Sequence, residues 1–469
     1  MSGLFSSLNA SVQALTAQSR ALEISGKNLA NVNNPSYARQ RIQFGDLGTV
    51  VTAQGAESMG IQALSVQQIR NALLDKQVMN ESGLSSYYQT LQSAYQRAQA
   101  GLGQTVNSTS SAATASTADS GIGAALDDVF NAFQSFAASP TDSGLRQALL
   151  QKTAVLTDRL NLTDSRLAQV QTDLNTQVAS DVTSVNGMLK QVADLNAQIG
   201  RFEINNPGSA VDLRDQRQAI LEQLATKLPI SSIEGPGGQV QVSAKDAGGS
   251  PVILVNLASV TGPVTFDGTQ LSAGTPATVL APTSGSIQGA IAARDGAIKT
   301  LRDNLDGLAQ QLVTSVNAAY NPTGTTGDYF KASGTTAATI SIDPSVTALN
   351  LKASDGGAAG DSTIAQALAA LATKPFSVSG GDQIDGSFST FYANSVGSLG
   401  QSLSSANSQV NNQSSIEQLV RTQRDSVSGV SLDEELADLQ KFQRAFQASS
   451  RVFTVIDNLL DNVVNQLGR

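Results

Sequence analysis

The sequence predicts a mainly α-helical protein with one small inserted β domain. Apolar residues recur at heptad spacing at both chain ends, and similar spacing extends over residues 127–228. Between residues 229 and 286 short β-branched runs, separated by glycine and proline, replace this spacing. We therefore expect a coiled coil or bundle formed by both termini, a domain of long helices, and a β insert.

The first thirty residues show one amphipathic pattern with a narrow apolar seam. Ser19 and Gly26 are small interruptions within it. The spacing predicts a helix from about residue 5 to residue 29. The seam consists of Phe5, Leu8, Val12, Leu15, Leu22 and Leu29.

The last forty residues show a second seam, which opens on a helix-start signal. Ser431 and Glu434 have the spacing of a capping box, and acidic residues crowd the first turns, where they favour the helix dipole. The pattern predicts a helix that starts near residue 431. Its apolar residues are Leu436, Leu439, Phe442, Phe446, Phe453, Ile456, Leu460, Val463 and Leu467.

The middle of the chain is predicted to be a long helical region followed by the insert. Helix is expected from about residue 127 to residue 228, with breaks at Pro140 and at Asn205–Gly208. Short strands are expected at Val240–Val242 and Val252–Val255.

Beyond the insert the pattern alternates between helix and loop. We expect helix from about Ile287 to Ala319, mixed loops and short strands over residues 321–374, and a pair of helices over residues 388–424. The Ser/Thr/Ala tract at residues 104–120 predicts a flexible connection. The expected parts are 1–100 (N-terminal helix, turn and extension), 101–228 (helical), 229–286 (β domain), 287–387 (helical return with loops and strands) and 388–469 (C-terminal helices).

Neither terminal seam is expected to be stable as an isolated helix. Burying one leucine contributes about 1.5–3 kcal/mol, so four heptad leucines offer on the order of 6–12 kcal/mol. Ordering the backbone costs about 1–2 kcal/mol per residue before hydrogen bonds offset it. We expect the two ends to pair with each other and then to pack against further copies. Packing of both helices on the central bundle remains an alternative.

Composition excludes several classes of chemistry. The chain contains no His, no Cys and no Trp, which rules out histidine-based triads, cysteine nucleophiles and histidine- or cysteine-ligated zinc. The net charge of -9 argues against a nucleic-acid surface. Residues 1–45 nevertheless carry four basic residues against one acidic residue, which predicts a solvated face or one that complements acidic neighbours. No secretory signal and no apolar run long enough to span a membrane is recognisable.

One charged cluster could suggest a site. Asp212, Arg214, Asp215 and Arg217 lie close together on a predicted helix. They could form an acid/base or cation site, but their spacing favours pairs on the helix surface. We expect no catalytic, cofactor or metal site.

The segment that follows the first helix predicts a helix stop. In the run NLANVNNPSYARQ, which begins at Asn28, Pro35 forbids helical continuation, Tyr37 can pack back, and Arg39 opens an extended run. The run resembles the N-terminal signature of flagellar rod, hook and hook-associated proteins. Its Tyr-x-Arg-Gln ending is the form typical of hook-associated protein 1. The residues of this signature turn that we single out are Asn28, Asn31, Asn33, Pro35, Tyr37, Arg39 and Gln40.

One position departs from the signature. The family usually has glycine where Ser36 stands, so a positive φ at this residue would be strained.

Further stretches extend the resemblance into the interior and to the C-terminus. They are LDDVFNAF at residues 126–133, GLRQALL at 144–150, DLRDQR at 212–217, GSIQG at 285–289 with Arg294-Asp295, and SLDEELADL leading into FQRAFQASSR at 431–451.

The resemblance implies a structural protein of the bacterial flagellum. Copies exported by the flagellar type III apparatus would form a ring at the hook–filament junction and would be required for filament assembly. The terminal helices would form an inner D0 layer, with D1 and the β insert outside. Implied partners are further copies, hook protein, hook-associated protein 3 and a cytoplasmic export chaperone at the C-terminal helix. Alternatives are a rod or hook subunit, a secreted coiled-coil effector or translocator, and a carboxylate hydrolase in the β insert.

Overall fold

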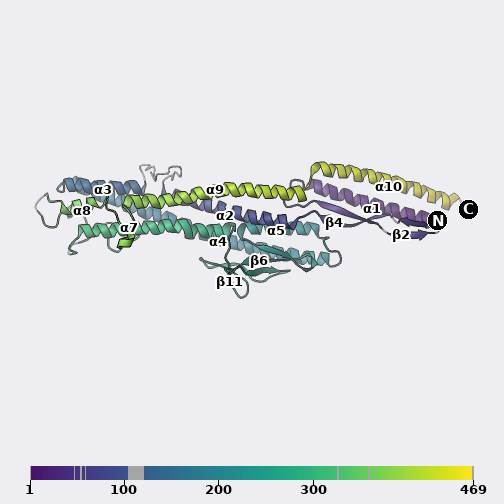
Figure 1. Ribbon diagram of the computed structural model, residues 1–469, viewed down its shortest axis with the longest axis horizontal. Helices are drawn as coiled ribbons and strands as arrows, with labels where there is room; N and C mark the ends of the chain where they lie inside the picture. The colour runs from purple at the N-terminus through teal and green to yellow at the C-terminus, as the bar shows by residue number, and fades with distance from the viewer. Residues whose placement is uncertain are drawn as a thin grey trace. The chain divides into compact units, whose positions relative to one another are not determined.

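The computed structural model describes residues 2–46, 48–52, 55–58, 60–103, 121–324, 327–357 and 360–466. The tract at 104–120 and Leu467 lie outside this described part. The chain forms two compact units. Unit 1 comprises residues 1–85, 182–285 and 413–469, and unit 2 comprises residues 86–181 and 286–412. The prediction of a mainly helical protein with inserted β structure is confirmed (Figure 1).

The two chain ends pair in unit 1 as long antiparallel helices, α1 (Ser2–Ala30) and α10 (Leu432–Gln466) (Figure 1). Small side chains form most of the buried face of α1, so that the two helix axes can approach closely. The apolar residues buried on this face are Ala17, Ala21 and Ile24.

A long extension follows α1 and folds into two antiparallel ribbons. Strand β1 (Gln40–Asp46) pairs with β4 (Ile61–Gln68), and β2 (Thr49–Thr52) pairs with β3 (Gly55–Ser58). A bulge after Gln43 shifts the β1–β4 register. Since a two-stranded ribbon is marginal alone, packing of β1 and β4 along α1 stabilises it.

Three long helices each contribute several residues to both units: α2 (Ala72–Leu102), α4 (Ser143–Glu203) and α9 (Phe388–Ser428). Helix α6 (Gly285–Ala293) also crosses the boundary, by its first residue. The expectation of two helices over residues 388–424 was wrong, because α9 is continuous. The serines and glycines along α9 weaken helix propensity but do not break it, since its buried face includes Phe388, Val396 and Leu399.

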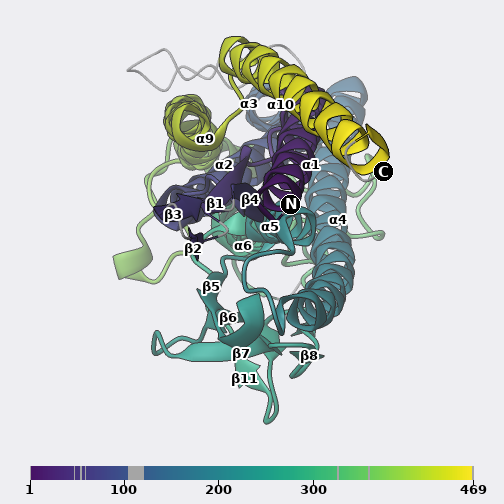
Figure 2. The same ribbon diagram turned by 90° about the vertical axis from the view of Figure 1, so that its right-hand side faces the viewer.

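The β insert of unit 1 contains two small antiparallel sheets (Figure 2). One has the order β5–β6–β7–β8, with strands Ser231–Glu234, Val240–Lys245, Pro251–Asn256 and Ser259–Val260. The other has the order β11–β10–β9, with strands Thr278–Val279, Leu271–Ala273 and Thr265–Phe266. A short 3-10 turn, η1 (Pro236–Gly238), joins β5 to β6. The insert follows helix α5 (Val211–Lys227), and its core includes Val242, Leu254 and Leu271.

The helices of unit 2 enclose an aromatic core. They include α3 (Ile122–Ala138), most of α6 (Gly285–Ala293), a π-helical turn η2 (Arg294–Ile298) and α7 (Lys299–Tyr320). The rings of Phe133, Tyr329 and Phe388 are fully buried. The buried Tyr329 hydroxyl lies 2.7 Å from the Thr153 hydroxyl, which satisfies both polar groups.

The expectation of short strands over residues 321–374 was wrong. The described part of this segment contains helix α8 (Thr363–Ala370) and one isolated bridge, Phe330–Ile342, within that range. A 3-10 turn, η3 (Val378–Gly380), follows it. Side-chain hydrogen bonds supplement this single bridge. The Asn317 side chain donates to the Phe330 carbonyl at 2.9 Å and accepts the Phe330 N–H at 2.8 Å. No described helix is long and apolar enough to cross a membrane.

Candidate assembly site: the turn junction and the terminal helices

The signature turn is closed by one buried asparagine. The Asn28 side chain donates to the Gln40 carbonyl at 2.8 Å and accepts the Gln40 N–H at 2.9 Å. Its oxygen also accepts the Tyr37 hydroxyl at 2.8 Å. Asn28 is 1% exposed, so it joins the end of α1 to the start of β1 with no competition from water.

The remaining asparagines shape the turn itself. Asn31 donates its side-chain N–H to the Lys27 carbonyl at 3.0 Å, and Asn34 accepts the Ser36 N–H at 3.2 Å. Asn33 and Pro35 are exposed. Among described non-glycine residues a positive φ occurs at Leu257, so Ser36 carries no left-handed strain at the position where the resemblance led us to expect glycine.

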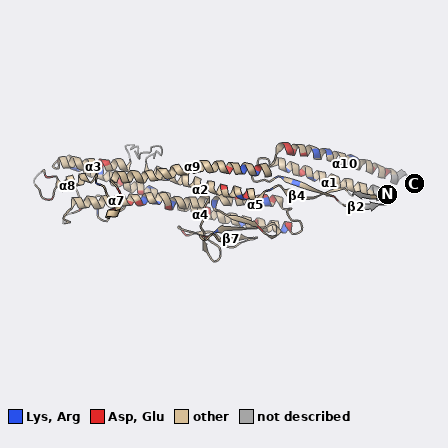
Figure 3. Cartoon of the chain, in the orientation of Figure 1, with Lys and Arg blue, Asp and Glu red and all other residues tan. Residues whose placement is uncertain are grey.

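Arg39 connects the turn to the start of α10. Its side chain donates to Glu435 at 2.6 Å and to Glu434, and it lies 3.6 Å from Asp438. The Glu434 carboxylate accepts a hydrogen bond from Arg39. The capping box expected between Ser431 and Glu434 is not among the described contacts. Burial alone lowers the pKa of Arg39, but the hydrogen bonds and charges of Glu434 and Glu435 outweigh it and raise that pKa. Figure 3 shows acidic residues at the start of α10.

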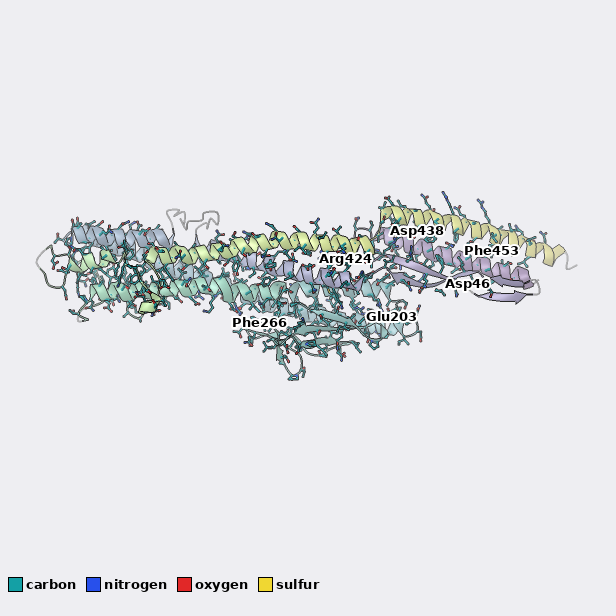
Figure 4. The ribbon with its side chains drawn as sticks, in the orientation of Figure 1. Asp46, Glu203, Phe266, Arg424, Asp438 and Phe453 are labelled. Atoms are coloured by element: carbon teal, nitrogen blue, oxygen red, sulfur yellow. The ribbon has the colours of Figure 1, made fainter. Side chains whose placement is uncertain are left out.

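Two further arginines bind the turn, one from the end of α9 and one from the connection between β4 and α2. Arg424, near the end of α9, donates to the Pro35 carbonyl at 2.8 Å and to Glu222 at 3.0 Å (Figure 4). Arg70 donates to the Ser36 carbonyl at 3.1 Å. These bonds satisfy carbonyls that the irregular backbone leaves without ladder partners.

Asp212 and Asp215 belong to this junction. Arg70 binds Asp215 at 2.6 Å and Asp75 at 3.1 Å, and Gln40 donates to Asp212 at 2.8 Å. Burial raises the pKa of Asp215 to about 6, although Arg70 favours the carboxylate. Burial, together with the charge of Asp215, also raises the pKa of Tyr37.

The two arginines of the same cluster turn toward the β insert. Arg214 binds both oxygens of the buried Glu203, at 2.8 Å and 2.7 Å (Figure 4). Arg217 donates to Asn196 and to the Gly238 carbonyl, and burial lowers its pKa to about 10.

The interpretation of residues 212–217 as surface pairs was therefore wrong. Asp215 and Arg217 are buried, and every described partner of the four residues lies outside the cluster. No group of three acidic side chains that could hold a metal ion is present in the described part of the chain. Spacing within one helix could not reveal these partners, because they come from distant segments.

The predicted seams of the terminal helices are only partly covered. Leu8, Leu15, Leu22 and Leu29 of α1 are half-buried, and Phe5 and Val12 are exposed. On α10, Ile456 and Leu460 are buried, Leu439, Phe442 and Phe453 are half-buried, and Leu436 and Phe446 are exposed. Phe442 packs on Phe44 of β1, with ring centroids 6.2 Å apart.

A second apolar stripe on α10 escaped the sequence interpretation. Val452, Val455 and Leu459 are 52%, 58% and 48% exposed, and their spacing places them along one face. Each of them directly precedes a seam residue in the sequence. A search for one heptad pattern assigns the seam residues and leaves these three out. Residues 447, 451 and 454, which neighbour this stripe in the sequence, are polar and exposed.

Comparisons with known proteins agree on one family. Residues 108–329 match the model described as the flagellar hook-associated protein FlgK helical domain, and residues 421–467 match the flagellar basal body rod FlgEFG protein C-terminal model. Flagellar hook-associated protein 1 of Bacillus subtilis is 26% identical over 522 aligned positions, which cover 100% of this chain and 99% of the relative. The Escherichia coli protein of the same name is 23% identical, with 98% and 99% covered.

A solved structure is also similar in part. The flagellar hook junction protein FlgK from Burkholderia pseudomallei has a TM-score of 0.44 and 20% identity, over 52% of this chain and 43% of that one. Together, the two family models and the full-length relatives show that the chain belongs to the flagellar hook-associated protein 1 family and is a structural protein of the bacterial flagellum.

Proposed function

We propose that copies of this chain pack side by side through α1 and α10 into a ring that joins the hook to the filament. The observation that carries this proposal is the second stripe of α10, Val452, Val455 and Leu459, which lies on a helix already packed against α1. A surface helix needs one apolar face to bind its own chain. A second such face favours a second helical partner.

The exposed area is large enough to matter. Burying a half-exposed valine, leucine or phenylalanine contributes on the order of 1 kcal/mol. The stripe together with Phe5 and Val12 therefore offers on the order of 5 kcal/mol per neighbouring copy. This is modest for one contact, but closure of a ring repeats it at every interface.

The terminal residues have roles in this proposal. The predicted seam residues hold α1 to α10 and line the contact between copies, and the signature turn fixes the angle at which α1 leaves the rest of unit 1. The helical parts and the β insert, with the boundaries given above, would lie outside the terminal layer. The half-burial of the heptad leucines supports a second covering layer.

We also propose the export route and the partners that the resemblance implies. The chain would be secreted through the flagellar type III apparatus and would contact hook protein and hook-associated protein 3. A cytoplasmic chaperone would cover α10 before assembly, which its exposed stripe supports. The lack of cysteine suits a chain threaded unfolded, because no crosslink has to be broken.

We propose that the protein is not an enzyme. A hydrolase in the β insert would require two carboxylates at one cavity. A cavity of about 480 Å³ lies between α2 and the root of the insert, and its charged lining residues are Glu81 and Lys245. Glu81 belongs to α2 and is hydrogen-bonded to Gln413, so this cavity offers no such pair.

The test places one charge in the stripe. Val455→Asp should abolish attachment of filaments and the recovery of the protein at the distal tip of isolated hook-basal bodies, because a carboxylate would be buried at each interface. Gln443→Asp adds the same charge at an exposed polar position of α10 and should leave both unchanged. Deletion of residues 1–30 should act like Val455→Asp. Wild-type protein absent from the hook tip, or a Val455→Asp variant that still carries filaments, would contradict the proposal.

A further inference from the structure

Two strongly exposed apolar side chains of unit 1 lie together where α4 ends. Phe202 and Ile204 are 69% and 72% exposed and flank Glu203 in the sequence. Turns are built from asparagine, proline and glycine, and Asn205–Gly208 supply these residues. The two apolar side chains are therefore not needed to form the turn. They make a projection, which we call the knob, that the described part of the chain leaves largely uncovered.

The base of the knob is held rigidly. Glu203 is buried, and Arg214 binds both of its oxygens and also donates to Glu234 of β5 at 2.9 Å (Figure 4). The Ala210 N–H donates to Glu203 at 3.3 Å, and Gly208 closes the turn with a positive φ of 80°. The knob therefore projects from a fixed backbone, so that little conformational entropy is lost when another surface covers it.

The cavity of about 480 Å³ between α2 and the root of the insert is a matching depression in unit 1. Its volume lies within the range of about 300–1,000 Å³ in which pockets enclose ligands larger than two side chains. Apolar side chains that replace water in such a cavity gain free energy. Half-buried apolar residues in its wall are Leu84, Pro229, Ile230 and Pro282.

The knob and the cavity of one copy lie at opposite ends of α5. Glu203, at the base of the knob, binds Arg214 in the first turn of α5, whereas Leu228, directly after the last residue of α5, lines the cavity. Helix α5 has 17 residues and is therefore about 25 Å long. A knob that fills this cavity has to come from another copy.

The charges around the two surfaces are complementary. Arg201 is exposed beside the knob, and Glu81 lines the cavity. Lys245 is an exposed cation of the cavity lining. It suits the end of α4 beneath the knob, because the carbonyls at a helix C-terminus carry partial negative charge.

The area of the contact suits a chain that associates only during assembly. The two knob side chains offer on the order of 250 Å², whereas a stable complex buries about 800 Å² on each partner. The knob alone cannot hold two copies together in dilute solution. It adds to a contact between copies that are already held side by side, because their effective concentration is then high.

We infer that the knob of one copy, Phe202 and Ile204, fills the cavity at the root of the insert of a neighbouring copy. The inference deepens the proposed function and rests on it, because adjacent copies are its premise. It adds a second contact, which is separate from the terminal helices. The contact is heterologous: each copy gives its knob to one neighbour and its cavity to another, so the contact is repeated around a ring.

Cysteine cross-linking is a clean test, because the chain has no cysteine of its own. Asn205, beside the knob, and Thr283, in the cavity lining, are exposed. In isolated hook-basal bodies treated with a short bismaleimide, a chain with Asn205→Cys and Thr283→Cys should give a ladder of covalent multimers. Either single variant should stay monomeric, and the two single variants produced together should give dimers and nothing larger. A second pair, Asn206→Cys with Ala281→Cys, should give the same ladder.

Phe202→Asp tests the knob itself. Added to the double-cysteine chain, it should lower the cross-linked fraction by roughly tenfold or more, because a carboxylate would be buried in an apolar cavity. Leu162→Asp is the matched control. Leu162 is an exposed apolar residue of the same helix, in the part that belongs to unit 2, and its replacement should leave the ladder unchanged.

The inference is overturned if both cysteine pairs leave the recovered chain monomeric, if the ladder survives Phe202→Asp, or if Leu162→Asp removes it equally. A single variant that dimerises shows a contact between like surfaces and also overturns it. Loss of the Phe202→Asp chain from the hook tip, with the Leu162→Asp chain recovered there, supports it. A chain recovered at the hook tip without a ladder leaves the proposed function intact, whereas a wild-type chain absent from the hook tip overturns both.

Discussion

Replacing Asn28 by alanine should be among the most damaging single changes to unit 1. Gln40 is 2% exposed, and the substitution would leave its carbonyl without a donor and its N–H without an acceptor. The Tyr37 hydroxyl would also lose its acceptor. A buried polar group without a partner costs about 1–3 kcal/mol. The two Gln40 groups therefore give about 2–6 kcal/mol, and the half-exposed Tyr37 hydroxyl adds little because water can reach it.

Native-state hydrogen exchange of the β1 and β4 amides measures this loss, because it reports the free energy of opening of these strands within unit 1. The controls are Asn31→Ala, which removes hydrogen bonds in an exposed part of the turn, and Tyr37→Phe, which removes one bond of the network. Each should cost less than about 1.5 kcal/mol. If Asn28→Ala costs less than about 1 kcal/mol, or no more than Asn31→Ala, the buried network does not hold the turn.

Two further predictions concern a buried carboxyl and two glycines. The pKa of Asp215 is raised to about 6 in the folded chain, so the folded state binds this proton more tightly than the unfolded state. The contribution of Asp215 to stability is present in full below its unfolded pKa and is lost as pH rises through 6. Between pH 5 and pH 7 the free energy of unfolding of unit 1 should fall by about 1 kcal/mol. Asp215→Asn should remove this pH dependence in denaturant titrations. Gly289→Ala should destabilise unit 2 by about 1–3 kcal/mol, because its Cβ would lie 2.7 Å from the Tyr87 carbonyl oxygen. Gly187→Ala, in open space on α4, should stabilise its helix by up to about 1 kcal/mol; equal effects of the two changes in thermal unfolding would refute the close packing of α6 on α2.

The elements that the sequence predicted best are those set by local periodicity. The helices α1 and α10, the breaks near Pro140 and residues 205–208, and the insert strands β6 and β7 follow from apolar spacing and from proline or glycine. Such signals act within a few residues of one another, so one sequence is enough to detect them. The continuity of α9 was harder to predict, because its serines and glycines suggested a break that tertiary packing overrides.

The contacts of the turn junction could not be predicted in the same way. The acidic partners of Arg39 lie almost four hundred residues away along the chain. Arg70 and Arg424 reach the turn from distant segments, and both also bind acidic residues of α5. A residue in such a network shows only its own charge in the sequence. The sequence predicted an extended run from Arg39 but not its pairing into the strands β1 to β4. Packing along α1 holds β1 and β4, rather than a strong alternation of their own.

Both compact units are built from segments that alternate along the chain. Unit 1 needs residues 413–469 to complete it, and unit 2 needs residues 286–412 to join residues 86–181. While a ribosome is still producing the first half of the polypeptide, neither core can close. Contacts between such distant segments form slowly. The nascent chain therefore remains incompletely folded for most of its synthesis, because the segments that complete both units come late in the sequence.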